Sequence, residues 1–282
     1  MALTRRDVIT GLLGGLLLQR AGAQGAAPPI FDAHVHYSHD AVELVPPKQA
    51  AQLLRAAGLR GALISSSDDR GTQLLLAEAP EIVVPELRPY RSRADTGSWT
   101  REPEVVRYME ERLARYRYVG IGEFHLFGDE ALLPVPRRMV ALARERNLVL
   151  HAHSDVAAVE HLFKQWPEAR VLWAHSGFDR PEAVREVLRR HPRLWCDLAH
   201  RTDQASQGKV DAAWRDAFVE FPDRFMVGSD TFTPERWHYI GPHASYTRGW
   251  LADLPQPLAE RIGWRNGEAL LRAPANAIAK PA

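Results

Sequence analysis

The feature that most restricts the fold is a repeated alternation of short apolar segments with longer amphipathic ones. Strands are predicted near residues 30–36, 61–66, 82–87, 119–123, 148–151, 171–175, 194–197 and 225–229. Apolar residues at three- and four-residue spacing, with charges opposite, predict helices at 105–116, 137–146, 156–165, 181–190 and 212–220. Eight strands alternating with helices imply a parallel sheet. The sequence therefore predicts an α/β fold, closed as a (β/α)8 TIM-type barrel.

A doubly wound open sheet is the competing fold. It would be expected to carry a glycine-rich phosphate loop after its first strand, and residues 31–38, FDAHVHYS, are not such a loop. We see no repeat, low-complexity tract or long linker after residue 29. Residues 24–282 are therefore expected to form a single barrel domain, at a length close to the roughly 250 residues typical of this fold.

The N-terminus has the three parts of a secretory signal peptide. Arg5 and Arg6 form a basic head, residues 8–18 are apolar, and residues 21–23 read Ala-Gly-Ala. The apolar run is shorter than the about 20 residues that span a membrane. Residues 4–10 resemble a twin-arginine export signal, with Val8 and Thr10 departing from the usual pattern. We expect residues 1–23 to be removed from an exported protein, periplasmic or secreted, that keeps no stable membrane anchor; a buried first helix or an anchor is the alternative.

Charge and cysteine usage narrow the expected partners. The formal net charge is +1, and lysines and arginines are interspersed with acids, which gives no sign of a nucleic-acid or membrane-surface partner. Cys196 is the single cysteine, so the chain has no internal disulfide. We expect a small-molecule substrate, and a homo-oligomer is left open.

Residues that bind metals stand at the ends of most predicted strands. Because strand residues alternate sides, Asp32, His34 and His36 are expected to share the inner face, with residues 31, 33 and 35 against the helices. Glu123 is expected on the same side of its strand as residues 119 and 121. Four strand ends supply one further candidate each: Glu123, His151, His175 and Asp230.

These residue types suit a divalent metal. Neutral imidazole and carboxylate are ligands for Zn²⁺ and similar ions, and barrel enzymes place their chemistry at the C-terminal strand ends. Taken singly, a strand-end histidine is more often a hydrogen-bonded structural residue, and a strand-end aspartate often caps the next helix. Six coincidences at one barrel rim favour a metal site instead.

The order of these motifs carries a family resemblance. FDAHVH, GIGEFH, LHAH, WAHSG, CDLAH and GSD follow one another, and residues 261–269 read RIGWRNGEA. Over residues 29–274 the chain resembles the amidohydrolase superfamily, in its amidohydrolase-related (amidohydrolase-2) branch. The resemblance implies that His34, His36, His151 and Asp230 hold a divalent metal, for which we expect Zn²⁺. It also implies that His175 either binds a second metal or polarises the scissile carbonyl.

Glu123 bears on the number of metals. TatD-type hydrolases, a related branch, carry Gly-Glu at this strand and use the carboxylate to bridge two metals. GIGEFH is similar up to Glu123 and then departs with Phe124 and His125. This favours two ions over one. His125 and His153 have the parity to approach the same space, and we expect them to face the substrate or to support the ligands.

The implied chemistry is activation of water by the metal. Asp230 is the candidate general base, and His175 would help to polarise the substrate oxygen. Asp32 is expected to orient the histidines of the first strand. Asp197 and His200 could do the same or touch the substrate.

Substrate contacts are expected from loops after the strands. The segment 231–257, interpreted as a long loop, contains Arg236 and Trp237, and the segment 88–93 contains Arg91. Aromatic rings interleaved with arginines suit a ligand with a flat apolar part and an anionic group. The alternative is that these arginines pair with surface acids. The full predicted set of substrate-binding residues is Arg91, His125, His153, His200, Arg236 and Trp237.

The function predicted from these observations is an exported, divalent-metal-dependent hydrolase that cleaves an amide, lactone or other ester of a small molecule. Three alternatives stay open. One is a decarboxylase similar to aminocarboxymuconate semialdehyde decarboxylase, against which Glu123 weighs. Another is a TatD-like phosphodiesterase, which the lack of a basic groove signature makes less favoured. The last is a non-catalytic periplasmic metal- or ligand-binding protein, and retention of Asp230 with the full ligand set argues against it.

Overall fold

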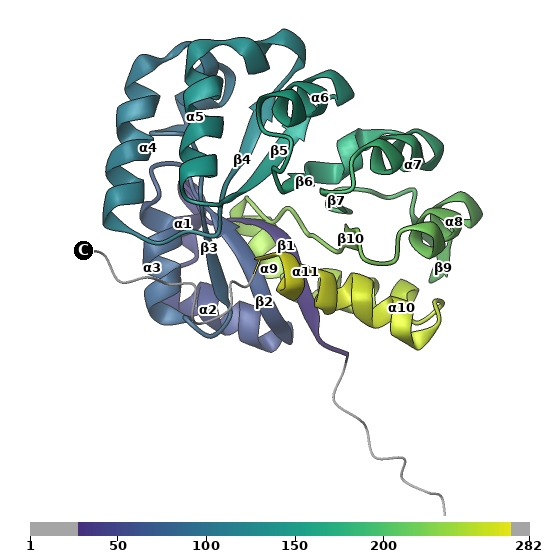
Figure 1. Ribbon diagram of the computed structural model, residues 1–282. Coiled ribbons are helices and arrows are strands. Elements are labelled where there is room, and N and C mark those ends of the chain that lie inside the picture. The colour runs from purple at the N-terminus through teal and green to yellow at the C-terminus, as the bar shows by residue number, and fades with distance from the viewer. Residues whose placement is uncertain (1–27, 272–282) are drawn as a thin grey trace, which may run out of the picture.

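Eight parallel strands form the centre of the molecule in the computed structural model, which describes residues 28–271 (Figure 1). They follow chain order: β1 (Ile30–His36), β2 (Leu59–Ser65), β3 (Val83–Leu87), β4 (Gly120–Leu126), β5 (Val149–Ser154), β6 (Val171–Trp173), β7 (Leu194–Asp197) and β10 (Phe225–Met226). Each agrees with a predicted strand to within a few residues. The predicted signal peptide, residues 1–23, lies outside the described residues.

The last strand returns to the first and closes the sheet. Ala33 N donates to Val227 O at 2.9 Å, and His36 N donates to Thr231 O at 2.8 Å. Asp230 N in turn donates to His34 O at 2.8 Å. These parallel contacts join β1 to the chain just after β10, so the strands form a nearly closed barrel. The predicted TIM-type barrel is confirmed.

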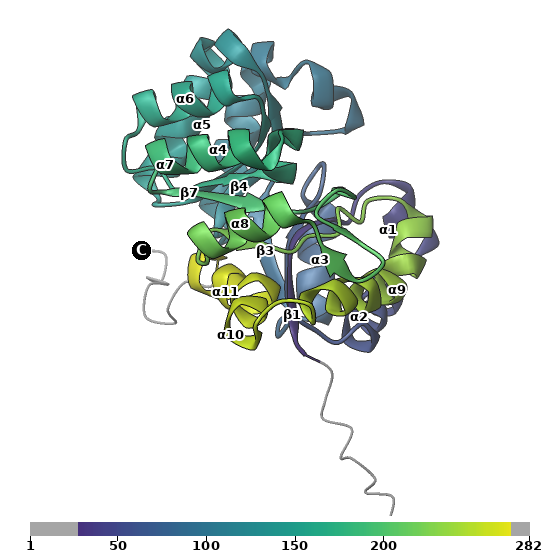
Figure 2. The same cartoon turned by 90° about the vertical axis from the view of Figure 1, so that its right-hand side faces the viewer.

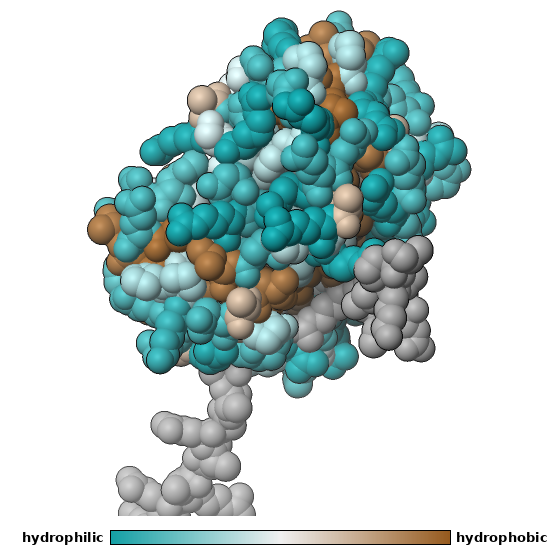
Figure 3. All heavy atoms as spheres, turned by 90° about the vertical axis from the view of Figure 1, so that its left-hand side faces the viewer, coloured by the Kyte–Doolittle hydropathy of each residue, from teal (hydrophilic) through white to brown (hydrophobic). Residues whose placement is uncertain are grey.

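Helices surround this barrel on the outside, as Figures 1 and 2 show. They are α1 (Asp40–Leu44), α2 (Pro47–Ala56), α3 (Arg70–Glu78), α4 (Pro103–Arg115), α5 (Pro134–Glu145), α6 (Val156–Gln165), α7 (Pro181–Arg190), α8 (Ala212–Glu220), α9 (Pro234–Leu251), α10 (Gln256–Glu260) and α11 (Asn266–Leu271). A short hairpin, β8 (Ala205–Ser206) with β9 (Lys209–Val210), precedes α8. The face seen in Figure 3 is largely hydrophilic with separate hydrophobic areas, as expected when the apolar side of each helix packs inward.

The segment after the last strand is not the long loop that was predicted. Residues 234–251 form the 18-residue helix α9. Its buried residues include Trp237, Ile240, Ala244, Thr247 and Leu251, at the three- and four-residue spacing of a helix face. Gly241 and Pro242 in its middle are typical loop residues and obscured this periodicity.

The barrel interior is filled by a small apolar layer. Six strands and helix α11 contribute to it, with Phe31, Ala33, Leu63, Val84, Val149, Leu172, Met226, Leu270 and Leu271. Their neighbours along the same strands, such as Ile64 and Trp173, belong to the larger core between the strands and the helices. This apolar layer lies inside the barrel, and the polar residues of the interior lie nearer the C-terminal ends of the strands.

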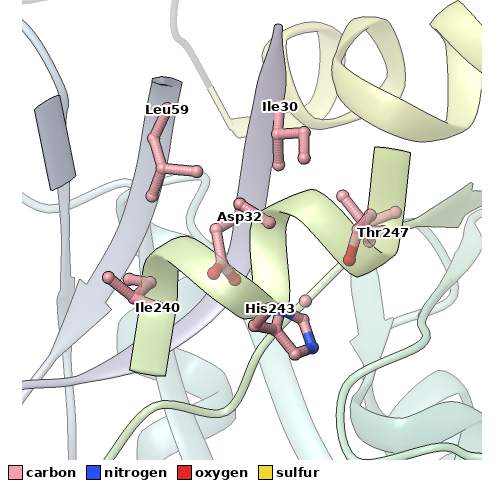
Figure 4. A pocket seen from close by; sticks show the side chains of 9 residues that line it. Ile30, Asp32, Leu59, Ile240, His243 and Thr247 are labelled. Atoms are coloured by element: carbon pink, nitrogen blue, oxygen red, sulfur yellow. The ribbon is translucent and has the colours of Figure 1, made fainter. Parts of the chain in front are cut away.

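The first strand departs from simple alternation. Phe31 and Ala33 lie in the inner layer, whereas Val35 packs in the outer core, and the pairing of β1 with β2 shifts between Asp32 and Val35. The prediction that residues 31 and 33 face the helices is therefore wrong. Asp32 instead lines a pocket of about 10 Å³ between β1 and α9, where Figure 4 shows it near His243. The shift brings His34 and His36 to the inner side, while Asp32 Oδ1 accepts from the backbone N–H groups of His34 and Ser229 at 3.1 and 2.9 Å.

No helix within residues 28–271 is long and apolar enough to cross a membrane.

Candidate metal centre

Two imidazole rings from β1 point at the same position. Nε2 of His34 lies 3.1 Å from Nε2 of His36, and the rings meet nearly at right angles with centroids 5.0 Å apart. Both residues are buried. Two carboxylates approach the same nitrogens: Glu123 Oε2 is 3.2 Å and Asp230 Oδ1 is 3.4 Å from His36 Nε2. Nitrogen and oxygen atoms that converge in this way lie close enough together to hold a cation.

The outer nitrogens of the inward-facing rings are each held by another group. His34 Nδ1 lies 3.1 Å from Asp197 Oδ2, and His36 Nδ1 lies 2.9 Å from Ser65 Oγ. His175 Nδ1 lies 2.9 Å from the carbonyl oxygen of Ala199, to which it donates. Partners of this kind fix the tautomer of metal-binding histidines and leave Nε2 with its lone pair. All three rings are therefore prepared to bind a metal through Nε2.

Glu123 lies between two groups of histidines. Its Oε2 faces His36, while its Oε1 is 2.9 Å from His153 Nδ1 and 3.4 Å from His175 Nε2. Ile121 packs in the outer core, and the pairing with β5 shifts between Gly122 and Phe124, so the expectation that Glu123 shares a side with residue 121 is wrong. The shift turns this carboxylate into the barrel.

Gly122 allows the two strands to approach closely at this shift. A Cβ at that position would lie 2.4 Å from the carbonyl oxygen of His151, and the φ of +153° is also unfavourable for other residues. The glycine in the GIGEFH motif is therefore needed for the position of the glutamate that follows it.

Asp230 completes the first group and contacts His200. Its Oδ1 faces His34 and His36, and its Oδ2 lies 3.2 Å from His200 Nε2. His200 is partly exposed and Asp230 is nearly buried. One oxygen of this carboxylate thus faces the histidines of β1, and the other faces a side chain in contact with solvent.

His151 has other partners than the ones predicted. Its Nδ1 lies 3.0 Å from Glu86 Oε2 and its Nε2 lies 3.1 Å from Asp197 Oδ2. Both ring nitrogens are therefore engaged by carboxylates, although the ring lies within 4.6 Å of the His34 ring. The structure brings His34, His36, Glu123, His175 and Asp230 together, and His151 lies beside them in a group with His34 and Asp197. His153, from the same strand, faces Oε1 of Glu123.

Asp197 is the central acceptor beneath the cluster. Its Oδ2 faces His34 and His151, and its Oδ1 accepts from the backbone N–H groups of His175 and Ala199 at 2.9 and 3.0 Å. Burial alone would raise the pKa of Asp197, but the facing imidazoles of His34 and His151 hold that pKa well below its ordinary value. The carboxylate is therefore ionised and supports three histidines at once.

The charge balance of the metal centre favours a cation. Burial would lower the pKa of His34, but Asp197, Glu123 and Asp230 hold it well above 6.5. Burial and then the charge of Arg88 lower the pKa of His36 to about 3, so this ring is neutral. In the absence of a metal, the three carboxylates favour a proton on His34. A divalent ion at this position would balance the same negative charge.

The layer around His151 is also charged. Burial would lower the pKa of His151, but Glu86 and Asp197 raise it from 6.5 to about 9. As with His34, the neighbouring carboxylates draw a proton to this ring when no cation is bound. Ligand atoms of His34, His151 and Asp197 lie close enough together to hold an ion, so the position of His151 fits both the predicted metal ligand and a buried ion-pair partner.

The backbone takes unusual conformations at several of these positions. His175, Ser176 and Phe178 have φ values of 56°, 51° and 55°, and His200 and Asp230 have 56° and 47°. Left-handed conformations cost non-glycine residues about 1–2 kcal/mol each, and they are typical of functional sites. They direct His175 and Asp230 into the cluster from chain segments that are no longer regular strand.

Four of the predicted substrate-binding residues lie at or near the cluster. His153 contacts Glu123, and the ring of His125 lies 4.4 Å from that of His153 and is held by the hydroxyl of Tyr90. His200 contacts Asp230. Arg236 donates to the carbonyl oxygens of Asp230 and Ser229 at 2.9 and 2.6 Å, which fixes the chain around the aspartate.

The other two are structural in their contacts. Trp237 is fully buried and donates from Nε1 to the carbonyl oxygen of His36 at 3.1 Å, so it supports β1 from behind. Arg91 pairs with Asp95, with Nη2 to Oδ1 at 2.8 Å, and the structure gives it no contact with the cluster. The alternative considered from the sequence, pairing with a nearby acid, describes Arg91.

Arg88 is a site residue that the sequence reasoning did not single out. Its Nη2 lies 2.9 Å from Glu123 Oε2, and its Nε donates to the backbone oxygen of Glu123 at 3.0 Å. Its position directly after β3 was the available signal, since barrel strand ends carry site residues. Glu86 was missed as well, because an acid one residue before a strand end is commonly on the surface.

Comparisons with known proteins agree with this architecture. The amidohydrolase family model matches residues 31–273. No curated protein matches the chain. Solved structures with similar folds include a TatD homologue from Escherichia coli K12, with 17% identity over 87% of this chain and 98% of that chain and a TM-score of 0.59. Organophosphorus hydrolase from Deinococcus radiodurans has 16% identity over 86% and 92%, with a TM-score of 0.55.

A third similar structure is a probable 2-pyrone-4,6-dicarboxylic acid hydrolase from Acinetobacter baumannii, with 12% identity over 86% and 98% and a TM-score of 0.50. At these identities the likeness concerns the fold. The family model, in contrast, covers most of the sequence, including every cluster residue described above. The chain therefore belongs to the amidohydrolase family and is a metal-dependent hydrolase.

Proposed function

We propose that this protein is exported and cleaves an amide, lactone or other ester bond of a small molecule with metal-activated water. The observation that carries the proposal is the pair of His34 and His36 Nε2 atoms, 3.1 Å apart, with oxygens of Glu123 and Asp230 on the same position. Two neutral ring nitrogens repel at this distance unless a proton or a cation lies between them. The donor set fits Zn²⁺, which prefers imidazole and carboxylate.

We infer two ions rather than one. His34, His36 and Asp230 form one group. A second group lies around Glu123 Oε1, which is 2.9 Å from His153 Nδ1 and 3.4 Å from His175 Nε2. Glu123 contacts both groups, because its Oε2 faces His36 at 3.2 Å and its Oε1 faces His34 at 3.6 Å as well as His153 and His175. Such a carboxylate could be shared by two ions. His153 is the proposed ligand from β5 in place of His151, since both nitrogens of His151 are engaged by Glu86 and Asp197.

A divalent ion bound there would supply a Lewis acid and lower the pKa of water from about 15.7 to about 7. Asp230 is the proposed general base. Burial would raise the pKa of this carboxyl, but the histidines of β1 hold it below its ordinary value, so the carboxylate is available to accept a proton. His200, 3.2 Å from Asp230 Oδ2, is placed to pass that proton toward solvent.

Arg88 is proposed to position Glu123. A guanidinium that contacts both the side chain and the backbone oxygen of one residue fixes its rotamer. Its positive charge also stabilises negative charge that develops on a substrate oxygen nearby. The phosphodiesterase alternative shares this arrangement, because a bridging carboxylate between two ions also suits a phosphoryl centre.

Export rests on residues 1–23 alone. A twin-arginine route carries folded proteins, which is compatible with loading of the metal before export. Fusion of residues 1–30 to a reporter protein tests it: periplasmic reporter that disappears when Arg5 and Arg6 are both changed to Lys supports the proposal. Reporter that stays in the cytoplasm contradicts export.

The central experiment combines metal analysis with turnover. Elemental analysis of the purified protein should find about two transition-metal ions per chain, and a panel of esters, lactones, amides and phosphodiesters identifies the bond cleaved. Asp230→Asn should abolish turnover in a folded protein, while Asp129→Asn, a change at an exposed aspartate that also pairs with a histidine, should not. A metal-free protein of full stability, or full activity of Asp230→Asn, would contradict the proposal.

A further inference from the structure

Three phenylalanines are exposed, and all three follow strands at the C-terminal end of the barrel. Phe127 directly follows β4, Phe178 lies in the turn after β6, and Phe232 follows β10. Their exposed fractions are 45%, 55% and 42%, and the other six phenylalanines of the chain are buried or half-buried. Single exposed apolar residues are ordinary on a protein surface. Three of one type around one site need a separate account.

Each of these rings contacts a histidine of the metal centre. Phe127 and Phe178 both lie 5.9 Å, between ring centroids, from His153. Phe178 also stacks on His175, at 4.5 Å and an angle of 15° between planes. The side chains therefore lie directly against rings that face Glu123.

The third phenylalanine continues the same row on the other side. Phe232 lies 6.0 Å from the ring of His200, which in turn lies 6.1 Å from His175. The guanidinium of Arg236 is 5.7 Å from the Phe232 ring, which helps to hold that ring in place. We name Phe127, Phe178 and Phe232 the aromatic rim.

The backbone indicates that the position of Phe178 is built rather than accidental. His175, Ser176, Gly177 and Phe178 all have φ between 51° and 65°. A bulky residue with positive φ is a rare and costly conformation. Without this left-handed turn, the chain after β6 would not fold the Phe178 ring back onto His175 while leaving its outer face in solvent.

Resting on the proposed function, we propose that the substrate carries a flat apolar group, an aromatic or similarly planar ring, that packs on the aromatic rim. Aromatic rings stack favourably with other planar groups, and an apolar surface beside a metal centre binds the part of a substrate that water solvates poorly. The sequence analysis suggested a flat ligand partly from Trp237, but this side chain is buried. The aromatic rim would contact the same class of ligand with other residues.

The test uses two probes that share one headgroup. Phenylphosphonate and methylphosphonate both present a tetrahedral oxyanion to the metal centre and differ only in the ring. Calorimetric titration of the Zn²⁺-loaded protein should give a Kd about tenfold or more lower for phenylphosphonate. Phe178→Ala should reduce the ratio of the two Kd values to about threefold or less; the methylphosphonate Kd of the same variant accounts for any change at the metal centre, where Phe178 stacks on His175. Phe178→Leu, apolar but not planar, should lie between.

Controls separate the inference from the proposed function. Val219→Ala removes an exposed apolar side chain on the outer helix α8 and should leave both Kd values unchanged. Zinc content and circular dichroism verify that each variant is folded and loaded. Equal Kd values for the two probes in the unmodified protein would overturn the aromatic rim as a binding surface, with the metal centre left intact.

Two further results would also be decisive. Binding of neither phosphonate would refute the proposed metal centre and the rim with it. If Phe→Ala changes at the rim instead dissociate an oligomer, measured by light scattering, and the preference for phenylphosphonate persists, the rim is a subunit interface and the inference is wrong.

Discussion

Replacing Asp197 by Asn tests how the metal centre is supported. Asn Oδ1 can still accept from the N–H groups of His175 and Ala199, so the backbone contacts are kept. The amide nitrogen that replaces Oδ2 cannot accept from His34 or His151. His34 then loses the partner that fixes its tautomer, and the charged His151 ring loses one of its two carboxylates.

Both losses have an expected size. Loss of a carboxylate that orients a metal-binding histidine lowers metal affinity by about 10- to 100-fold. Loss of one partner from a buried ion pair costs about 3–5 kcal/mol, because the remaining charge is left without compensation. The chain buries Asp197 completely, so neither effect is relieved by solvent. Asp197→Asn should therefore lower zinc affinity about 10- to 100-fold and the unfolding free energy of the metal-free protein by about 3–5 kcal/mol.

A chelator competition titration measures the first quantity, and urea denaturation followed by circular dichroism measures the second. Asp129→Asn is the matched control, because Asp129 accepts from His161 Nε2 at 3.0 Å at the surface, where the expected cost is about 0–1 kcal/mol. If Asp197→Asn keeps zinc affinity within about threefold and stability within about 1 kcal/mol, the supporting role assigned to Asp197 is refuted.

Three further changes separate the roles of neighbouring residues. His153→Ala should lose one of two zinc ions in elemental analysis, with the fold intact. His151→Ala should keep both ions and lower the unfolding free energy. The reverse result would identify His151, and not His153, as the ligand. Burial raises the pKa of Asp32 from 3.8 to about 6, so the folded state holds this proton more tightly than the unfolded state. The resulting stabilisation is fully present below about pH 4 and is lost as the pH rises through 6, which lowers the unfolding free energy by about 3 kcal/mol. Asp32→Asn should remove that loss, and denaturation at pH 4 and pH 7 should show the variant gaining stability relative to the unmodified protein as pH rises; an unchanged difference would contradict the effect of burial. Gly122→Ala would place a methyl group 2.4 Å from the carbonyl oxygen of His151 and should destabilise the protein by about 3 kcal/mol or more in the same assay; a variant of normal stability would contradict the close approach of β4 and β5.

Much of the fold was predictable because the spacing of apolar residues along the sequence follows the face of each helix or strand that is buried. The strands are short apolar runs, and helices such as α6 and α7 show their buried stripe plainly, so their bounds were predicted to the residue. Helix α9 was missed although its buried residues have the same spacing. Gly241 and Pro242 interrupt the pattern, and packing of α9 against α1, α2 and β9 compensates for their low helix propensity.

The cluster was predictable in its members more than in its connections. The C-terminal ends of parallel barrel strands meet at one end of the barrel, so metal-binding residue types at these ends are expected to lie together. This reasoning grouped His34, His36, Glu123, His175 and Asp230. The choice between His151 and His153 was not available from one strand. Both face the barrel interior, and Glu86 and Asp197, which engage His151, come from strands three and seven. Contacts across the barrel depend on register, which alternation along a single strand does not specify.

The irregular positions of the barrel strands coincide with the candidate metal-binding residues. For this reason, predictions from side-chain alternation were wrong at these positions. The pairing of β1 shifts before His34, and that of β4 shifts at Glu123. A regular strand sends every second residue inward at one level, which suits a layer of apolar side chains such as Phe31 and Met226. A metal centre instead needs donors from several strands to meet at one point. A local shift or a left-handed residue such as Asp230 changes the direction of one donor without moving the strand that carries it. We therefore expect the irregular backbone to be as necessary for metal binding as the ligands, as Gly122→Ala will test with the glutamate itself unchanged.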